Sequence, residues 1–204
     1  MTIKYSSAEA AIKALLSCNA GEMFEKIRGN QHSMEKHFSK QSAYEAAGQT
    51  GYPQGYFKRV ANITIKSSDD LSRSNVFDKT VRAALLKVGA KKKAEFGKKL
   101  RGREIVVPQK SMAAKDDILG LVQQVIGSEH CELRENNTDP NTRFLAVSPI
   151  PDGFYGRAID AGNVKSRDCT MAVVVINATS TTNPQIVTIF PASDQYVNGR
   201  PLLV

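Results

Sequence analysis

Tryptophan is absent from this chain of 204 residues, and aromatic residues make up only 7% of it. No apolar run approaches the roughly 20 residues that a membrane-spanning helix needs, so we expect no membrane span. The first residues lack the charged start, long apolar core and small-residue cleavage site of a secretory signal. If the protein leaves the cell, we therefore expect it to use a specialised delivery route.

Cysteine is also scarce. The three cysteines, Cys18, Cys131 and Cys169, are odd in number and far apart, and no C-x-x-C pair occurs. His130 is adjacent to Cys131, but the spacing of these residues does not complete a zinc site. We expect reduced, structural thiols, a protein that works in a reducing compartment, and no bound metal.

The charge is strongly unbalanced, at +8 with an isoelectric point near 9.4. Much of the excess lies in the segment 79–103, which includes the run Lys91, Lys92 and Lys93. A concentrated positive charge attracts nucleic acid or an acidic protein partner. A solvated helix face that only keeps the protein soluble is the alternative, and the segment alone does not decide between these.

Hydrophobic periodicity predicts helices in the first two thirds of the chain and strands in the last third. The helical segments are 7–19 with Ser6 or Ser7 as the cap, a short apolar turn at 23–27, then 31–47, 76–100 and 110–126. Strands are predicted at 56–65, 103–107, 144–150, 153–159, 170–178 and 184–192. TSTTNP reads as the connection of a hairpin between the last two strands. This order indicates an α+β fold, with N-terminal helices followed by a C-terminal antiparallel sheet.

No internal repeat and no Gly/Ser linker divides the sequence, so we expect one domain over 1–204, in one or two lobes. Residues 1–28 are either part of that domain or a helical extension before it. The sequence by itself leaves this open.

Two of the three histidines lie in HSMEKHFSK, residues 32–40. On a helix, His32 and His37 would point about 140° apart, unlike the same-face pair of H-E-x-x-H zinc sites. One histidine can then face a cleft while the other supports packing. A histidine taken at random more often has a surface or core role, so this segment needs support from the rest of the chain.

That support comes from three later motifs: YGR at 155–157, AVVVI at 172–176 and IVTIFP at 186–191. With HSMEKHFSK before them, the chain resembles the ribonuclease-A-like toxin domains at the C-termini of contact-dependent growth-inhibition proteins and related polymorphic bacterial toxins. The resemblance covers residues 30–193. It implies a two-lobed ribonuclease-like architecture and a metal-independent endoribonuclease without a cofactor.

By the same resemblance, four residues are expected to be catalytic: His32, His37, Arg157 and Thr188. His32 is favoured over His37 as the proton carrier. The residues expected to bind substrate are Lys40, Arg59, Tyr155, Lys91, Lys92 and Lys93. Histidine titrates near neutral pH and can act as acid or base, while a cation stabilises the phosphoryl oxygens.

The sequence departs from the family pattern at two places. Phe190 stands where the family strand usually has tyrosine, so Tyr155 or Tyr196 would have to supply any phenol. The segment SAYEAAGQ after the histidines lacks the usual arginine. The charge must then come from Lys40, Arg59 or Arg157. Plain structural roles also remain open: a surface residue for Arg157 and His130, and a β-branched strand residue for Thr188.

The resemblance implies an interbacterial toxin that is delivered into a neighbouring cell and cleaves RNA, tRNA being one candidate, in the target-cell cytoplasm. A cognate immunity protein, expected to be acidic, would neutralise it, and the toxin would otherwise be a monomer. The alternative is a non-catalytic nucleic-acid-binding or ribosome-associated protein that works through its basic segment.

Overall fold

The computed structural model describes residues 2–28, 37, 43, 45, 47, 54–64, 104–108, 115–159 and 166–204. The chain divides into two compact units, one formed by residues 1–57 and 113–204 and the other by residues 58–112. In the second unit, strand β1 (Gln54–Thr64), which enters it from the first, pairs antiparallel with β2 (Glu104–Pro108). Both strands were predicted, whereas the predicted helix at 76–100 lies outside the described residues.

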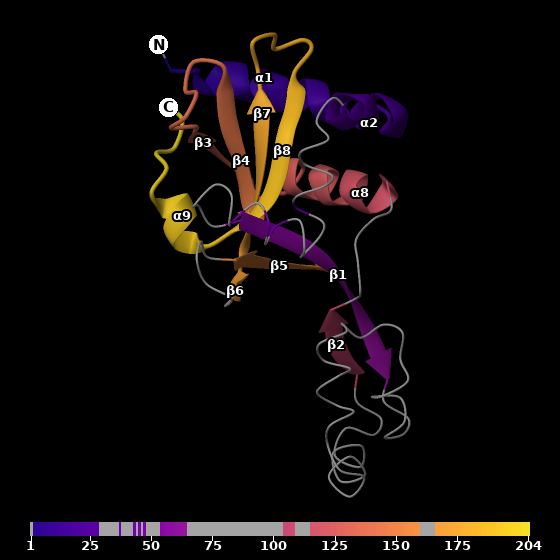
Figure 1. Ribbon diagram of the computed structural model, residues 1–204. Helices are drawn as coiled ribbons and strands as arrows, with labels where there is room; N and C mark the ends of the chain where they lie inside the picture. Colours follow the sequence, from indigo (N-terminus) through magenta and orange to yellow (C-terminus); the bar gives the residue numbers. More distant parts are fainter. Residues whose placement is uncertain are drawn as a thin grey trace, which may run out of the picture. The chain divides into compact units, whose positions relative to one another are not determined.

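The first unit is built on an antiparallel sheet in the order β3-β4-β7-β8 (Figure 1). Its strands are β3 (Glu132–Glu135), β4 (Arg143–Pro149), β7 (Met171–Asn177) and β8 (Gln185–Ala192). The five central residues of β7 are all buried, as expected for a strand covered on both faces. The α+β class, the three later strands of this sheet and the hairpin between β7 and β8 are confirmed.

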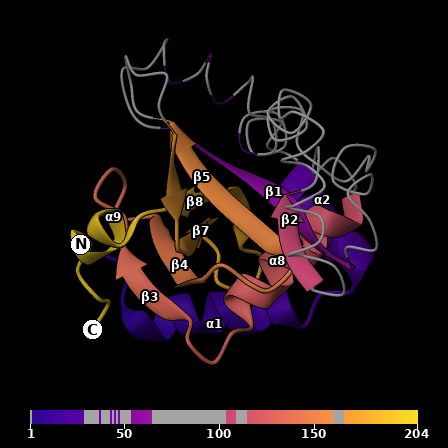
Figure 2. The same cartoon turned by 90° about the horizontal axis from the view of Figure 1, so that it is seen from below.

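Three helices cover one face of this sheet: α1 (Tyr5–Leu16), α2 (Ala20–Arg28) and α8 (Lys115–Ile126). Figure 2 shows α1 and α8 side by side beneath the strands. Their buried residues recur at helical spacing, for example Ala8, Ala11 and Leu15 on α1. Helices α1 and α2 are therefore packed into the same unit as the C-terminal sheet.

The opposite face of the sheet has its own apolar cluster, which joins Leu145, Val147, Val173 and Val175 to Ala192 and Val197. Val197 belongs to the short helix α9 (Asp194–Asn198), which directly follows β8. A β-bulge at Val187 interrupts the register between β7 and β8, and regular pairing resumes at Thr188, opposite Val175. Such bulges re-aim the side chains beside them.

A second sheet has the order β2-β1-β5-β6, with β5 (Phe154–Ile159) paired to β6 (Ser166–Cys169). Two glycines of this sheet lie against the end of β8. A β-carbon on Gly55 would lie 2.5 Å from the Pro191 carbonyl oxygen, and one on Gly156 would lie 2.5 Å from the Pro191 β-carbon. Only a glycine allows backbones to approach this closely.

The helix starts differ in part from the prediction. Ser6 and Ser7 lie inside α1, which begins after Lys4 without any side-chain cap, so the predicted serine cap is wrong. Helix α2 has a reciprocal cap, because Asn19 Oδ1 accepts from Glu22 N at 3.0 Å and Glu22 Oε2 accepts from Asn19 N at 2.9 Å. Helix α8 ends before Gly127, as predicted.

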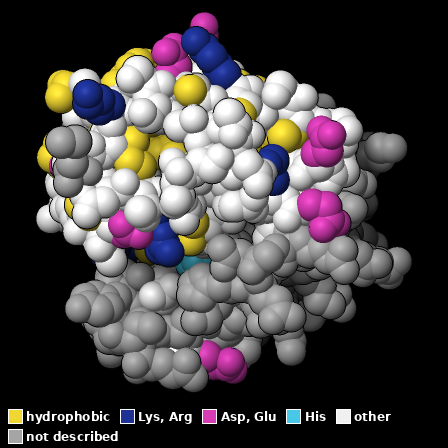
Figure 3. Space-filling view, turned by 90° about the horizontal axis from the view of Figure 1, so that it is seen from above, with side chains coloured by type: hydrophobic (Ala, Val, Ile, Leu, Met, Phe, Trp, Pro, Cys, Tyr) yellow, Lys and Arg dark blue, Asp and Glu magenta, His cyan; other side chains and the backbone are white. Residues whose placement is uncertain are grey.

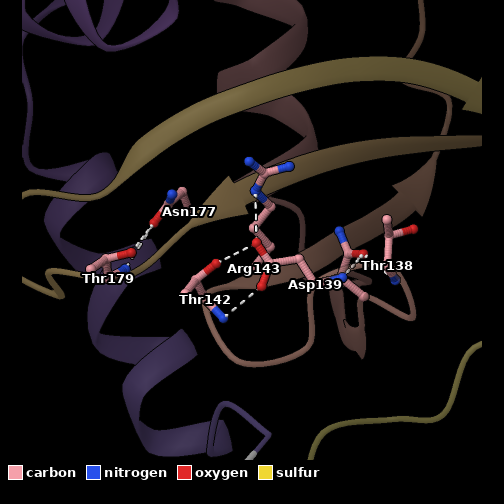
Figure 4. A network of polar contacts seen from close by, with 7 residues as sticks. Thr138, Asp139, Thr142, Arg143, Asn177 and Thr179 are labelled. Atoms are coloured by element: carbon pink, nitrogen blue, oxygen red, sulfur yellow. Dashed lines mark hydrogen bonds and ion pairs between the residues drawn. The ribbon is translucent and has the colours of Figure 1, made fainter.

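A polar network fixes the turn between β3 and β4 (Figure 4). Asp139 accepts from the Thr142 amide at 3.3 Å and from its hydroxyl at 2.5 Å, and its other contact is Arg143 Nε at 3.4 Å. The Thr142 carbonyl in turn accepts from Ala178 N at 2.8 Å, just beyond β7. The polar segment predicted as a loop is thus an ordered turn tied to the neighbouring strand.

The chain's last residues cover the outer edge of β3. Glu135 N donates to Pro201 O and Leu203 N to Leu133 O, each at 2.9 Å. This pairing occupies backbone groups that an exposed edge strand would present to other chains. Strands β3 and β6 and helix α9 were not predicted, since each is only four or five residues long. Among the described residues, no helix has the length and apolar character needed to cross a membrane.

The contact between Gly156 and Pro191 predicts that Gly156→Ala destabilises the fold. The new methyl group would also lie 2.6 Å from Ile150 Cδ1, so we expect a loss of about 1–3 kcal/mol in the free energy of unfolding, measured by urea denaturation. Gly120→Ala on α8 is the matched control: its nearest neighbour would lie at 3.9 Å, and the gain in helix propensity should stabilise by about 0.5–1 kcal/mol. Equal stabilities of Gly156→Ala and wild type would contradict the packing described.

Candidate functional site

Residues from four distant parts of the sequence meet at the end of β8. Gly55 and Gly156 lie against Pro191, and His37 contacts both Gly55 and Phe190. Three of the four motifs that carry the resemblance, HSMEKHFSK, YGR and IVTIFP, therefore converge within the first unit. The fourth, AVVVI, is the central strand β7, which pairs with β8.

His37 is held on both sides by the start of β1. Its Nδ1 lies 2.6 Å from the Gly55 carbonyl oxygen, and its own carbonyl accepts from Phe57 N at 2.7 Å. Because a carbonyl oxygen can only accept, the hydrogen bond assigns the ring proton to Nδ1, which makes Nε2 the basic nitrogen of the neutral ring. The residue is only 5% exposed, so the orientation of the imidazole is fixed by its surroundings.

The His37 ring lies against β8, with its centroid 5.7 Å from that of Phe190. Thr188 stands two residues before Phe190, and side chains two apart on a strand share one face. The Thr188 hydroxyl is buried and has no hydrogen-bond partner among the residues that the structure describes. A buried hydroxyl without a partner costs about 1–3 kcal/mol, so a ligand oxygen that accepted from it would recover that energy.

Helix α9 brings two further side chains to the same end of the sheet. The Tyr196 ring meets Phe190 edge-on with centroids 5.6 Å apart, and the Arg200 guanidinium lies 4.6 Å from the centre of the Tyr196 ring. Ser193 caps α9, since its Oγ accepts from Tyr196 N at 3.3 Å. A row of four side chains thus runs from His37 through Phe190 and Tyr196 to Arg200.

Arg157 and Tyr155 lie elsewhere. Because Gly156 faces Pro191, its two neighbours on β5 point to the opposite face of that strand. There Arg157 Nε lies 3.2 Å from Asp168 Oδ1, and the Tyr155 hydroxyl donates to the same carboxylate. The structure therefore does not bring these two predicted site residues to the face that carries Thr188.

The surroundings of Tyr155 make its hydroxyl a poor acid. Burial first, and then the hydrogen bond to Asp168, raise the pKa of Tyr155 from 10.0 to about 12, against a smaller lowering by Arg157. A phenol with this pKa stays protonated at neutral pH. It acts here as a hydrogen-bond donor to Asp168.

The other predicted site residues divide into two groups. Arg59 is exposed on β1, within residues 58–112. His32, Lys40, Lys91, Lys92 and Lys93 lie outside the described residues. Of the predicted helix over 31–47, the structure describes four residues: His37 lies in a bend, while Ala43, Glu45 and Ala47 are helical.

Sequence reasoning did not identify Arg200, and it named Tyr196 only as one possible source of a phenol. Both residues depend on α9, whose start is marked by the cap residue Ser193 followed by Asp194 in the first turn. The cap residue could have been recognised from the sequence, whereas the contact of Tyr196 with Phe190 of β8 could not.

Two cavities of about 640 and 650 Å³ lie away from this surface. The first lies beside the end of α8 and includes His130, whose side chain is 70% exposed, which confirms its surface position. The second lies between α1, α2 and the β7–β8 connection. Neither is lined by His37, Thr188 or Arg200.

The face shown in Figure 3 is mixed in charge in its described part, where lysine and arginine side chains are scattered among acidic and polar ones. Within the described ranges, no three His, Cys, Asp or Glu side chains are grouped so that they could hold a metal ion. The three cysteines are free, and burial raises the pKa of Cys131 to about 11.

Comparison with known proteins gives no relative. No family model matches the chain, and neither a curated protein nor a solved structure matches it.

The raised pKa of Tyr155 has a consequence for stability at high pH. The folded protein holds this proton more tightly than the unfolded chain, so the stabilisation is present below pH 10 and is lost as the pH rises toward about 12. The difference in tyrosinate absorbance between wild type and Tyr155→Phe should show one phenol titrating near 12. Asp168→Asn should lower the pKa of the Tyr155 phenol. Titration of this phenol near 10 in the wild type would contradict its burial and its hydrogen bond to Asp168.

Proposed function

We propose that this protein is a metal-independent endoribonuclease. The observation that carries the proposal is the convergence of His37 and Thr188 on β8. A buried imidazole with a fixed proton position lies against Phe190, and two residues before Phe190 a buried hydroxyl has no partner within the described part of the chain. An oriented proton carrier and a donor that a phosphoryl oxygen can satisfy are two of the groups that RNA transesterification needs.

The reaction would begin when a base takes the proton of the ribose 2′-hydroxyl, whose oxygen then attacks the neighbouring phosphorus. Charge develops on the phosphoryl oxygens, where the Thr188 hydroxyl can donate a hydrogen bond. An acid protonates the 5′-oxygen as its bond to phosphorus breaks. His37 serves one of the two proton-transfer roles through Nε2, because Nδ1 is occupied by the Gly55 carbonyl.

The second proton carrier is proposed to be His32, five residues earlier in the same segment. Lys40 and the basic run Lys91, Lys92 and Lys93 are proposed to hold the RNA backbone. The net charge of +8 favours such a polyanionic substrate. Arg157 and Tyr155, which engage Asp168 on the other face of β5, are better explained as structural residues.

The biological role follows from the resemblance in the sequence. We propose an interbacterial toxin delivered by a specialised route, which cleaves RNA in the target-cell cytoplasm and is neutralised by an acidic immunity protein. A strongly basic protein is suited to an acidic partner, since opposite charges steer their association.

The catalytic proposal is tested with Thr188→Val and His37→Asn. Valine keeps the β-branched shape of Thr188 and removes only a buried hydroxyl that has no partner among the described residues. The free energy of unfolding should therefore stay the same or rise by up to about 1–3 kcal/mol, while RNA cleavage falls roughly tenfold or more. Asparagine can still donate to the Gly55 carbonyl but cannot carry the proton, so cleavage should fall at least about 100-fold.

Cleavage of tRNA and of total RNA is measured in EDTA. His130→Ala is the control, because that side chain is 70% exposed and lies away from β8. Binding of RNA without cleavage, unaffected by either substitution, would favour the non-catalytic binding protein instead. Cleavage that requires a divalent metal would also contradict the proposal.

Histidine acid–base catalysis further predicts a bell-shaped dependence of the cleavage rate on pH, centred near neutrality, because one group must be neutral and another protonated. His37→Asn should remove one limb of the bell in its residual activity. A rate that rises continuously to high pH would show that no histidine acts as the acid.

A further inference from the structure

Arg200 differs from the other arginines that the first unit positions near the sheet. Arg134 is paired with Glu132 at 2.6 Å, Arg143 with Asp139 at 3.4 Å and Arg157 with Asp168 at 3.2 Å. Among the described residues, no carboxylate pairs with the Arg200 guanidinium; its contact is the face of the Tyr196 ring. Its charge is therefore oriented without being neutralised.

The backbone at Arg200 is also fixed. Arg134 Nη1 donates to the Arg200 carbonyl at 2.6 Å and to the Val197 carbonyl at 3.2 Å, which holds the end of α9 against β3. The Arg134 side chain is only 13% exposed, and Glu132 keeps it in place. Arg134 and Glu132 thus hold in place the segment that carries Arg200.

The location of Arg200 connects it to the proposed catalytic face. The row of rings formed by Phe190 and Tyr196 runs from the His37 imidazole to the guanidinium, with 5.7, 5.6 and 4.6 Å between successive groups. This row is longer than one phosphodiester unit. A cation at its far end is therefore placed for a different backbone phosphate from the one proposed to lie at Thr188.

We propose that Arg200 binds a backbone phosphate of single-stranded RNA, with Tyr196 holding the plane of the guanidinium and Arg134 fixing its backbone. This proposal rests on the ribonuclease function and names where the substrate strand runs. The guanidinium carbon lies over the Tyr196 ring, which holds the charge in place, and the N–H groups of a guanidinium match the geometry of phosphate oxygens. Arg134 acts as a positioning residue and touches no substrate.

The test measures binding to an RNA oligonucleotide whose 2′-hydroxyls are replaced by hydrogen, so that it binds but cannot be cleaved. Arg200→Gln should weaken binding roughly tenfold and make the slope of log affinity against log salt less steep by about 0.7, the value for one lost contact to a single strand. Arg200→Lys keeps the positive charge but loses the paired N–H groups of the guanidinium, so its affinity for the oligonucleotide should lie between those of the wild type and Arg200→Gln.

Lys13→Gln is the matched control, because it removes one positive charge from α1, on the other side of the sheet, where the lysine is paired with Glu9. It should leave the salt slope unchanged. Tyr196→Ala should weaken binding as Arg200→Gln does, whereas Tyr196→Phe, which keeps the ring, should not. Circular dichroism and urea midpoints establish that each variant is folded.

The outcomes separate this proposal from the catalytic one. If the wild type binds the analogue but cleaves no RNA, the ribonuclease proposal fails and the salt slopes still decide the role of Arg200. If Arg200→Gln binds with wild-type affinity and slope, Arg200 makes no phosphate contact and the inference is overturned, even where cleavage is confirmed. A wild type that does not bind the analogue overturns it as well.

Discussion

The close approach of three chain segments at Pro191 is the contact on which the rest of the candidate site depends. Gly55 on β1 and Gly156 on β5 lie so close to Pro191 at the end of β8 that a β-carbon on either glycine would clash with it. That approach places the Gly55 carbonyl where His37 Nδ1 can donate to it, and so fixes the imidazole over Phe190. Larger residues at either glycine would push the sheet away and separate the histidine from the strand that bears Thr188.

The two faces of β5 explain why only some of the motif residues act together. Gly156 meets β8, so Arg157 and Tyr155 must point away from it and satisfy each other's charge and hydrogen bonding through Asp168. The β-bulge at Val187 has a comparable effect on β8, because regular pairing resumes at Thr188 with its hydroxyl on the same face as Phe190. Local backbone geometry thus separates the residues that form an ion pair from those proposed to act on RNA.

The elements with strong periodicity were predictable, and the short ones were not. Long apolar stretches such as the five buried residues of β7 leave little choice of structure, and the amphipathic pattern of α8 and its end at Gly127 are equally local signals. β3, β6 and α9 are four or five residues long, too short to show a period. The predicted cap at Ser6 or Ser7 was wrong because α1 starts at Tyr5, two residues before the predicted start, and places both serines inside the helix.

The α+β class, the order of the longer helices and strands and the excess of positive charge could be read from the sequence alone, and motif order singled out His37 and Thr188. Composition and periodicity are local properties that each segment shows without reference to the rest of the chain. The contact of His37 with Phe190, the pairing of Arg157 with Asp168 and the place of Tyr196 and Arg200 beside β8 became known from the folded structure. These contacts join segments far apart in the chain and depend on how the segments pack around Pro191, so a local sequence pattern does not predict them.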